Sequence, residues 1–221
     1  MIDKHINFFE FQKAAVQPGC PLCRIVADRA DRYIDNMLFE HVSNRSFRKS
    51  HRQAGGFCSF HSGNLVSFRD GLAVAILGRD ILEERIAHFR KRKPWRPKEI
   101  CPVCAERKRI ENEYVTFLSG CGGETDEERE LQKLYRESEG LCAPHYGMLL
   151  ETCKKVPAWI RDFEEHKFDE LKKRVDNFIE LSAYGRQKEF RALSQRDQLV
   201  WKELAFSLRG QADRIIIDHI P

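Results

Sequence analysis

Two copies of one cysteine and histidine pattern constrain this chain more than any other feature. In each copy a Cys-Pro-x-Cys pair is followed, some 35 to 40 residues later, by a Cys-x-x-His pair. Each copy therefore supplies three sulfur atoms and one imidazole nitrogen, which is a complete tetrahedral ligand set for zinc. The eight candidate ligands are Cys20, Cys23, Cys58 and His61 in the first copy, and Cys101, Cys104, Cys142 and His145 in the second.

The local spacing of these residues suits helix beginnings. Pro21 and Pro102 directly follow the first cysteine of each Cys-Pro-x-Cys pair, and proline favours the first turn of a helix. Cys58 and His61 are three residues apart, so on a helical turn both side chains point to the same side. We therefore expect each zinc ion to hold the beginnings of two helices together.

The motifs specify the ligand chemistry, but they do not specify which Cys-Pro-x-Cys pair shares a metal ion with which Cys-x-x-His pair. Pairing within each copy is favoured, because each copy is then self-sufficient. The alternative exchanges the half-motifs, so that Cys20 and Cys23 meet Cys142 and His145. Iron is the competing metal, and Zn²⁺ is favoured because mononuclear Cys3His iron sites are uncommon.

Both ligand sets favour a structural metal over a catalytic one. A catalytic zinc normally keeps one position open for water, whereas four protein ligands close the site. The sequence contains no His-Glu-x-x-His motif, and no general base stands beside either ligand pair. We therefore expect a protein without enzymatic activity that carries two zinc ions.

The two copies indicate a tandem duplication. Cys101 follows Cys20 by 81 residues, and Cys142 follows Cys58 by 84. The repeats are expected at residues 1–93 and 94–185, sharing one core, with a helical extension at 186–221.

Apolar residues recur three or four positions apart through most of the chain, which predicts an all-α helical bundle of about seven helices. The only strand-like run is Ile215-Ile216-Ile217, and Glu164-Glu165-His166 is interpreted as a solvated helix face. Each apolar stripe is interpreted as core packing, although heptad spacing also allows a homodimer. The stripe after His61 contains Leu65, Phe68, Leu72, Ala75, Leu82, Ile86 and Phe89, interrupted by Arg79.

Composition excludes some classes of protein. No apolar run approaches the roughly 20 residues that span a bilayer, so no membrane association is expected. The first 16 residues lack an apolar signal-peptide segment, which favours the cytoplasm. In a reducing cytosol eight cysteines are better explained as metal ligands than as disulfides.

A basic segment joins the two copies. With a formal net charge of only +4, the whole chain does not by itself indicate nucleic-acid binding. A solvated linker is the favoured interpretation, and the alternative is a phosphate-binding surface on which the tryptophan stacks on a base. The residues concerned are Arg90, Lys91, Arg92, Lys93, Trp95, Arg96 and Lys98.

Two cysteines remain outside the ligand sets. Cys153 is expected to be a small core residue. Cys121 lies in a glycine-rich loop, where the favoured interpretation is an incidental cysteine and the alternative is an exposed reactive thiol.

The paired motifs Cys20-Pro21-Leu22-Cys23 and Gly56-Phe57-Cys58-Ser59-Phe60-His61 resemble a family of uncharacterised prokaryotic proteins, known only as a domain of unknown function. The similarity extends over about residues 18 to 185. It implies a helical, cytoplasmic metal-binding protein and supplies no reaction. The function expected is a zinc-stabilised scaffold that binds another macromolecule, with nucleic acid as one candidate; the alternative is a thiol-based redox sensor that releases zinc on oxidation.

Overall fold

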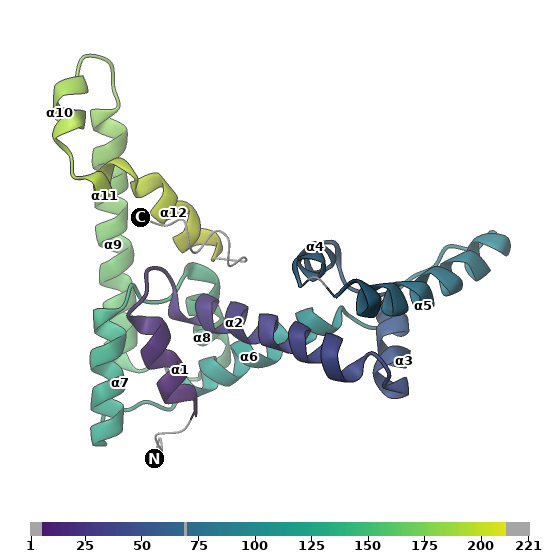
Figure 1. Ribbon diagram of the computed structural model, residues 1–221. Helices are drawn as coiled ribbons and strands as arrows, with labels where there is room; N and C mark the ends of the chain where they lie inside the picture. Colours follow the sequence, from purple (N-terminus) through teal and green to yellow (C-terminus); the bar gives the residue numbers. More distant parts are fainter. Residues whose placement is uncertain (1–5, 69, 211–221) are drawn as a thin grey trace. The chain divides into compact units, whose positions relative to one another are not determined.

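The structure is a computed structural model that describes residues 6–68 and 70–210 (Figure 1). The described residues form helices and no strand, so the all-α prediction is confirmed. Ile215-Ile216-Ile217 lies outside the described residues. The described part holds twelve α-helices, more than the number expected, because several short helices interrupt the longer apolar stripes. The elements are α1 (Ile6–Ala15), α2 (Pro21–Asn36), the π-helical turn η1 (Met37–His41), α3 (Arg45–Ala54), α4 (Ser59–Ser67), α5 (Gly71–Arg90), α6 (Pro102–Ser119), α7 (Asp126–Glu137), α8 (Ala143–Thr152), α9 (Ala158–Leu181), α10 (Gln187–Ala192), α11 (Gln195–Gln198) and α12 (Val200–Arg209).

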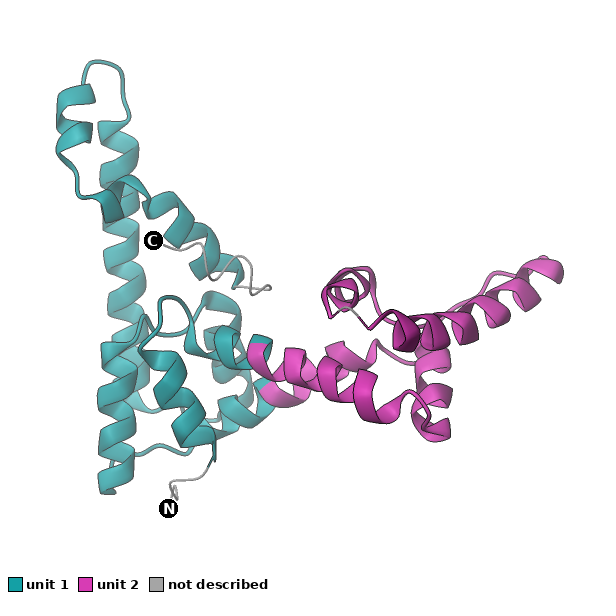
Figure 2. Ribbon diagram, viewed as in Figure 1, with its two compact units in different colours: residues 1–27, 111–221 teal, residues 28–110 magenta. Residues whose placement is uncertain are grey.

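The chain divides into two compact units (Figure 2). Unit 1 contains residues 1–27 and 111–221, and unit 2 contains residues 28–110. These bounds differ from those of the repeats expected at 1–93 and 94–185. The repeats describe a duplication of the sequence, and that duplication stays a prediction. None of the described helices has the combination of length and apolar character needed to cross a bilayer.

Unit 1 is built around the long helix α9. Helices α10, α11 and α12 pack against α9, α12 also packs against α8, and α1 packs against α7. Tyr135 on α7 lies at the centre of the aromatic core, fully buried. Its ring stacks on Phe11 with centroids 6.0 Å apart, and the edges of Trp159 and Phe163 meet it at 5.2 and 5.4 Å. Aromatic packing thus joins α1, α7 and α9.

Unit 2 packs α3 and α4 against α5. Arg48 on α3 forms a two-point ion pair with Asp80 on α5, with nitrogen–oxygen distances of 2.5 and 2.7 Å. Asp80 is only 4% exposed, and the paired guanidinium holds its pKa below the usual range. The apolar core of unit 2 consists of Ala30, Ile34, Met37, Leu38, Leu65, Ala73, Leu77, Cys101 and Val103.

The apolar stripe of α5 is not core, which corrects the interpretation drawn from the sequence. Leu72, Leu82 and Phe89 are 74%, 58% and 66% exposed. The residues that α5 does bury are Ala73, Leu77 and Asp80. The helical period was therefore predicted correctly, but the face that packs against the unit was not.

Candidate metal centres

Four metal-ligating side chains converge in unit 1. Cys20, Cys23, Cys142 and His145 place their ligand atoms within 4.8 Å of one another, and all four residues are buried. The Sγ atoms of Cys20, Cys23 and Cys142 lie 3.4, 3.5 and 3.2 Å from His145 Nδ1. The Sγ atoms of Cys23 and Cys142 are 3.6 Å apart. We call this cluster site 1.

A second cluster, site 2, lies in unit 2. It consists of Cys58, His61, Cys101 and Cys104, again with all ligand atoms within 4.8 Å. The three Sγ atoms lie 3.3, 3.5 and 3.4 Å from His61 Nδ1, in the same order of residues. The Sγ atoms of Cys58 and Cys104 are 3.7 Å apart. All eight residues predicted as ligands are therefore brought together in two groups of four.

The spacing of these atoms fits a tetrahedral zinc ion. Bond lengths of about 2.3 Å to sulfur and about 2.0–2.1 Å to nitrogen place ligand atoms about 3.8 Å apart for two sulfurs and about 3.5 Å for sulfur and nitrogen. The sulfur–sulfur distances of 3.6 and 3.7 Å and the sulfur–nitrogen distances of 3.2 to 3.5 Å are close to these values. Each cluster thus has the donor set and the dimensions that Zn²⁺ requires.

Each ligand pair stands at the beginning of a helix, as predicted. Helices α2 and α6 begin at Pro21 and Pro102, directly after Cys20 and Cys101. Cys58 and Cys142 are the N-cap residues of α4 and α8. Site 1 therefore joins the beginnings of α2 and α8, and site 2 joins those of α4 and α6. The unpaired N–H groups of a helix beginning also favour the thiolate form of nearby cysteines.

The favoured prediction of pairing within each copy is wrong, and the half-motifs are exchanged. Cys20 and Cys23 meet Cys142 and His145, while Cys58 and His61 meet Cys101 and Cys104. The physical reason is the helix that follows each Cys-Pro-x-Cys pair. Helix α2 has 16 residues and α6 has 18, which correspond to rises of about 24 and 27 Å. Each helix carries the chain away from its own first ligand pair before the second pair of that copy is reached.

The thiols in each cluster affect one another strongly. In site 1, hydrogen bonding to Cys142 and Cys20, together with burial, raises the pKa of Cys23 far above its usual range. In site 2, burial and the neighbouring Cys101 raise the pKa of Cys104 to about 12. Three adjacent thiolates therefore repel one another. A divalent cation offsets this repulsion because it pairs with all three negative charges.

The two sites differ in their surroundings. Cys58 and Cys104 are half-buried, whereas every ligand of site 1 is buried. His145 has Glu111 Oε1 3.7 Å from its Nε2, a carboxylate suited to orient a metal-binding imidazole. The corresponding Nε2 of His61 is buried and has no hydrogen-bond partner among the described residues. Site 1 is thus the better supported of the two.

A buried carboxylate, that of Glu164, supports site 1. Glu164 on α9 is 0% exposed, so the solvated helix face expected at Glu164-Glu165-His166 is wrong for Glu164, although Glu165 and His166 are exposed. Its Oε1 accepts hydrogen bonds from Tyr135 Oη at 2.6 Å and from the Leu141 N–H at 2.7 Å, and Lys167 pairs with the other oxygen. Leu141 directly precedes Cys142, so Glu164 fixes the turn that carries this ligand.

Gly140 allows this close approach. Its φ is +67°, and a Cβ atom there would lie 2.5 Å from Glu164 Oε1. The sequence signal was the glycine two residues before Cys142, which marks a turn but does not identify what lies against it.

A cavity of ≈ 320 Å³ lies beside site 1. Cys20 and Cys142 contribute to its lining, together with Arg196 from α11 and Lys202 from α12. Both cysteines that line the cavity already belong to the four-donor cluster of site 1. The cavity therefore adds no separate set of metal ligands.

The two cysteines outside the clusters differ in exposure. Cys121 is 0% exposed, and burial raises its pKa to about 12, with the Glu128 carboxylate adding to the effect. Its Sγ donates to the Glu128 carbonyl at 3.5 Å. The alternative of an exposed reactive thiol is therefore wrong for Cys121. Cys153 is half-buried at the end of α8, so the expectation of a core residue is wrong for Cys153.

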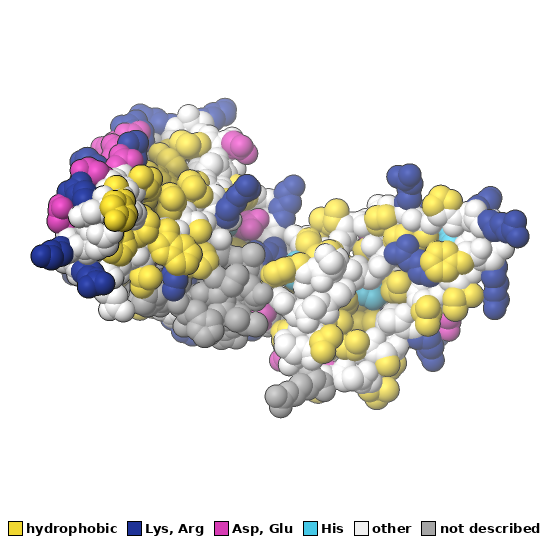
Figure 3. Space-filling model, turned by 90° about the horizontal axis from the view of Figure 1, so that it is seen from above, with side chains coloured by type: hydrophobic (Ala, Val, Ile, Leu, Met, Phe, Trp, Pro, Cys, Tyr) yellow, Lys and Arg dark blue, Asp and Glu magenta, His cyan; other side chains and the backbone are white. Residues whose placement is uncertain are grey.

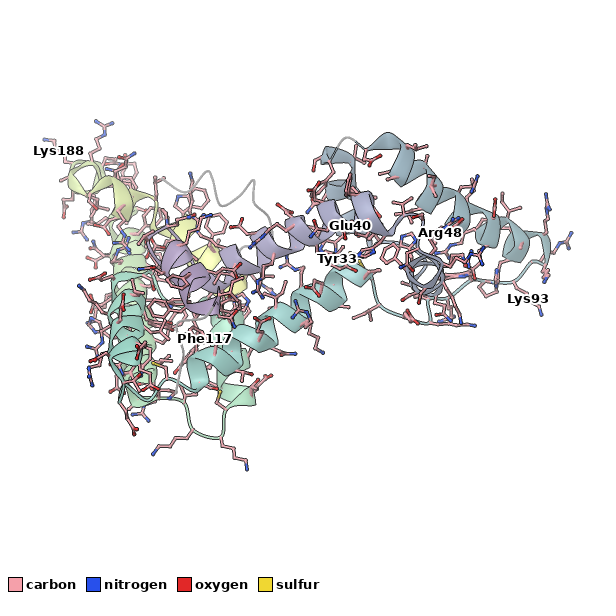
Figure 4. The ribbon with its side chains drawn as sticks, turned by 60° about the horizontal axis from the view of Figure 1, so that its bottom comes forward. Tyr33, Glu40, Arg48, Lys93, Phe117 and Lys188 are labelled. Carbon is pink, nitrogen blue, oxygen red and sulfur yellow. The ribbon has the colours of Figure 1, made fainter. Side chains whose placement is uncertain are left out.

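The basic segment after α5 is exposed, but its tryptophan is already engaged. Lys93 extends into solvent (Figure 4), and Lys and Arg side chains gather around this end of unit 2 (Figure 3). The Arg85 guanidinium lies over the Trp95 ring, 3.6 Å from the centroid. The same ring lies so close to Gly55 that a Cβ atom on Gly55 would overlap it. Trp95 therefore packs against α3 and α5, and Arg85 already occupies one face of its ring.

Comparison with known proteins places the chain among uncharacterised relatives. Residues 10–96 match the profile of a "Family of unknown function (DUF6062)". The chain resembles an uncharacterised family. The matched segment contains Cys20, Cys23, Cys58 and His61, which are half of each metal cluster. It ends at residue 96, whereas the similarity was expected to extend to about residue 185.

A curated relative covers more of the chain. The "Uncharacterized 23.9 kDa protein in xynA 3'region" of Caldicellulosiruptor sp. (strain Rt8B.4) is 26% identical over 172 residues, which are 75% of this chain and 83% of the relative. No solved structure matches the chain significantly.

Proposed function

We propose that the protein is a non-enzymatic scaffold that binds two zinc ions, one at each Cys3His cluster. The observation that carries the proposal is the tetrahedral spacing of four protein donors in each cluster. Zn²⁺ is the preferred ion, because three thiolates and one imidazole suit it better than they suit iron. Four protein ligands leave no position for a reacting water, so both ions are assigned a structural role.

Metal analysis tests the proposal directly. The purified protein is expected to contain two zinc ions per chain, and removal by a strong chelator is expected to abolish much of the helical circular dichroism. Structural zinc contributes on the order of 10 kcal/mol to folding at neutral pH, comparable to the stability of a whole domain. Helix content that persists after both ions leave would contradict a structural role.

The scaffold is proposed to act in the cytoplasm by binding a macromolecule. A reducing compartment keeps the eight cysteines available as thiolates. Nucleic acid is the candidate partner favoured by the exposed basic residues from Arg90 to Lys98, which would contact phosphates and not stack on bases. Fluorescence anisotropy with a labelled oligonucleotide is expected to show affinity that falls steeply with salt. No binding at low salt would remove nucleic acid as the partner.

A redox sensor that releases zinc on oxidation is the second candidate. Its support is the half-buried state of Cys58 and Cys104, and the cavity beside Cys20 and Cys142. Mild peroxide is then expected to release the ion of site 2 before that of site 1, as measured with a chromogenic zinc indicator. Retention of both ions with reduced ligand thiols would exclude this function.

A further inference from the structure

Helix α5 carries a heptad seam that faces solvent. Its six positions are separated by three, four, three, four and three residues, the spacing of a and d positions in a coiled coil. Every one is exposed, and the exposed fractions of its large apolar side chains range from 38% for Ile86 to 74% for Leu72. Hydrophobic side chains are visible on this part of the surface (Figure 3). The seam consists of Leu72, Ala75, Arg79, Leu82, Ile86 and Phe89.

The seam is not needed to hold α5 in unit 2. At 100° per residue, its centre lies on the opposite side of the helix from Ala73, Leu77 and Asp80, which are the residues that α5 buries. A 20-residue helix with one buried face and a second apolar face at heptad spacing is typical of a helix that pairs with another.

We propose that the occupant of this seam is α5 of a second copy of the chain, packed antiparallel about a two-fold axis. The seam is symmetric about the point between Asp80 and Ile81. In an antiparallel pair Leu72 faces Phe89, Ala75 faces Ile86, and Arg79 faces Leu82. Each small or medium side chain thus meets a larger one, which fills the space between the helices.

Charge selects the antiparallel orientation. A parallel pair would place the Arg79 side chains of the two copies opposite each other in the seam. The antiparallel pair instead places each Arg79 next to Glu83 of the second copy. Glu83 flanks the seam and lies 3.8 Å from Arg79 of its own helix, and both side chains are exposed and free to reorient. A single charged residue at an a position commonly sets the register of a coiled coil in this way.

The length of the seam sets the strength expected. From Leu72 to Phe89 it rises about 26 Å, or about five helical turns. Specific interfaces bury at least about 1,000 Å² in total, and a pair of helices of this length is near that lower limit. A reversible dimer with a dissociation constant in the micromolar range is therefore expected. The inference does not depend on the identity of the metal.

Sedimentation velocity of the zinc-loaded full chain tests the dimer, from about 1 to 100 µM. Leu82→Lys places a charge in the seam twice per dimer, so it is expected to weaken association about 100-fold, tenfold or more for each lost leucine contact. Val66→Lys is the matched control, because Val66 is 72% exposed on α4 and lies outside the seam. Both variants should keep wild-type helix content. A monomeric wild type at 100 µM, or equal effects of the two variants, would overturn the proposal.

Orientation is tested separately. Arg79→Glu and Glu83→Arg are each expected to weaken the homodimer, and their mixture to form a heterodimer. A photo-crosslinking benzoylphenylalanine at position 89 should link to the peptide containing Leu72 of an isotopically labelled second copy. A link to Phe89 of that copy would indicate a parallel pair, and a link within one chain would show that the seam is covered internally; either result contradicts the antiparallel dimer.

Discussion

Glu164 offers a sharp test of how the fold supports a metal centre. Replacement by alanine removes the acceptor for Tyr135 Oη and for the Leu141 N–H, and both donors are then left in a region with 0% and 1% exposure. Each unsatisfied buried donor costs about 1–3 kcal/mol, whereas Lys167, at 19% side-chain exposure, can turn to water.

The net loss is smaller than the sum of these contacts. Burial raises the pKa of Glu164, although Lys167 and the two hydrogen bonds act in the opposite direction. The buried carboxylate therefore carries a desolvation cost, and its removal recovers that free energy. We therefore expect Glu164→Ala to lower the free energy of unfolding by about 3 kcal/mol. Glu165→Ala is the matched control on the exposed face of α9 and should change it by less than about 0.5 kcal/mol.

The metal sites should respond unequally to the same change. Because the Leu141 N–H precedes the ligand Cys142, its release loosens site 1 and is expected to weaken metal affinity there by about 10–100-fold. Site 2 belongs to the other unit and should be unaffected. Cadmium-113 resonances of the two sites, followed during chelator titration, distinguish them. Equal weakening of both sites, or stability equal to that of Glu165→Ala, would refute the reasoning.

Three further predictions follow from single contacts. Because the half-motifs are exchanged, Cys20→Ser combined with Cys142→Ser should disrupt site 1 alone and leave one zinc ion per chain. Cys20→Ser combined with Cys58→Ser should disrupt both sites and leave none. Metal analysis giving the reverse would indicate pairing within each copy. Burial lowers the pKa of His51 from 6.5 to about 4, so the folded state favours neutral imidazole and loses stability as pH falls below 6.5. Compared with wild type, His51→Leu should lose about 2 kcal/mol less between pH 7 and pH 5 in urea unfolding, and parallel losses would contradict this. Gly140→Ala places a methyl group against Glu164 at a φ of +67°, and should destabilise site 1 by about 2–3 kcal/mol; unchanged zinc retention would show that the turn adapts.

Much of the candidate site could be predicted because its signals are local. The ligand types, the Cys-x-x-Cys and Cys-x-x-His spacings and the prolines beside them specify both the chemistry and the beginnings of the helices. The helical period of α5 was equally readable. The face that α5 buries was not, because two faces of the helix carry apolar residues and only packing decides which one meets the core.

Burial of polar groups was the least predictable property. Glu164 lies in a sequence rich in charged residues, and nothing there distinguishes it from its exposed neighbour Glu165. Cys121 lies in a glycine-rich loop that would ordinarily be exposed, yet it is fully buried in unit 1. Trp95 lies within a basic segment, yet Arg85 and Gly55 occupy its surroundings. Each of these depends on residues far away in the chain.

The sequence alone thus determined that this chain is helical and that it carries two sets of metal-ligating side chains at helix beginnings. Those properties follow from donor chemistry and from spacings of three or four residues, which no tertiary contact alters. Only the tertiary structure decided which ligand pairs meet. A 16-residue helix moves the chain about 24 Å, so the partner of Cys20 depends on the path of the whole chain and not on the nearest motif along it.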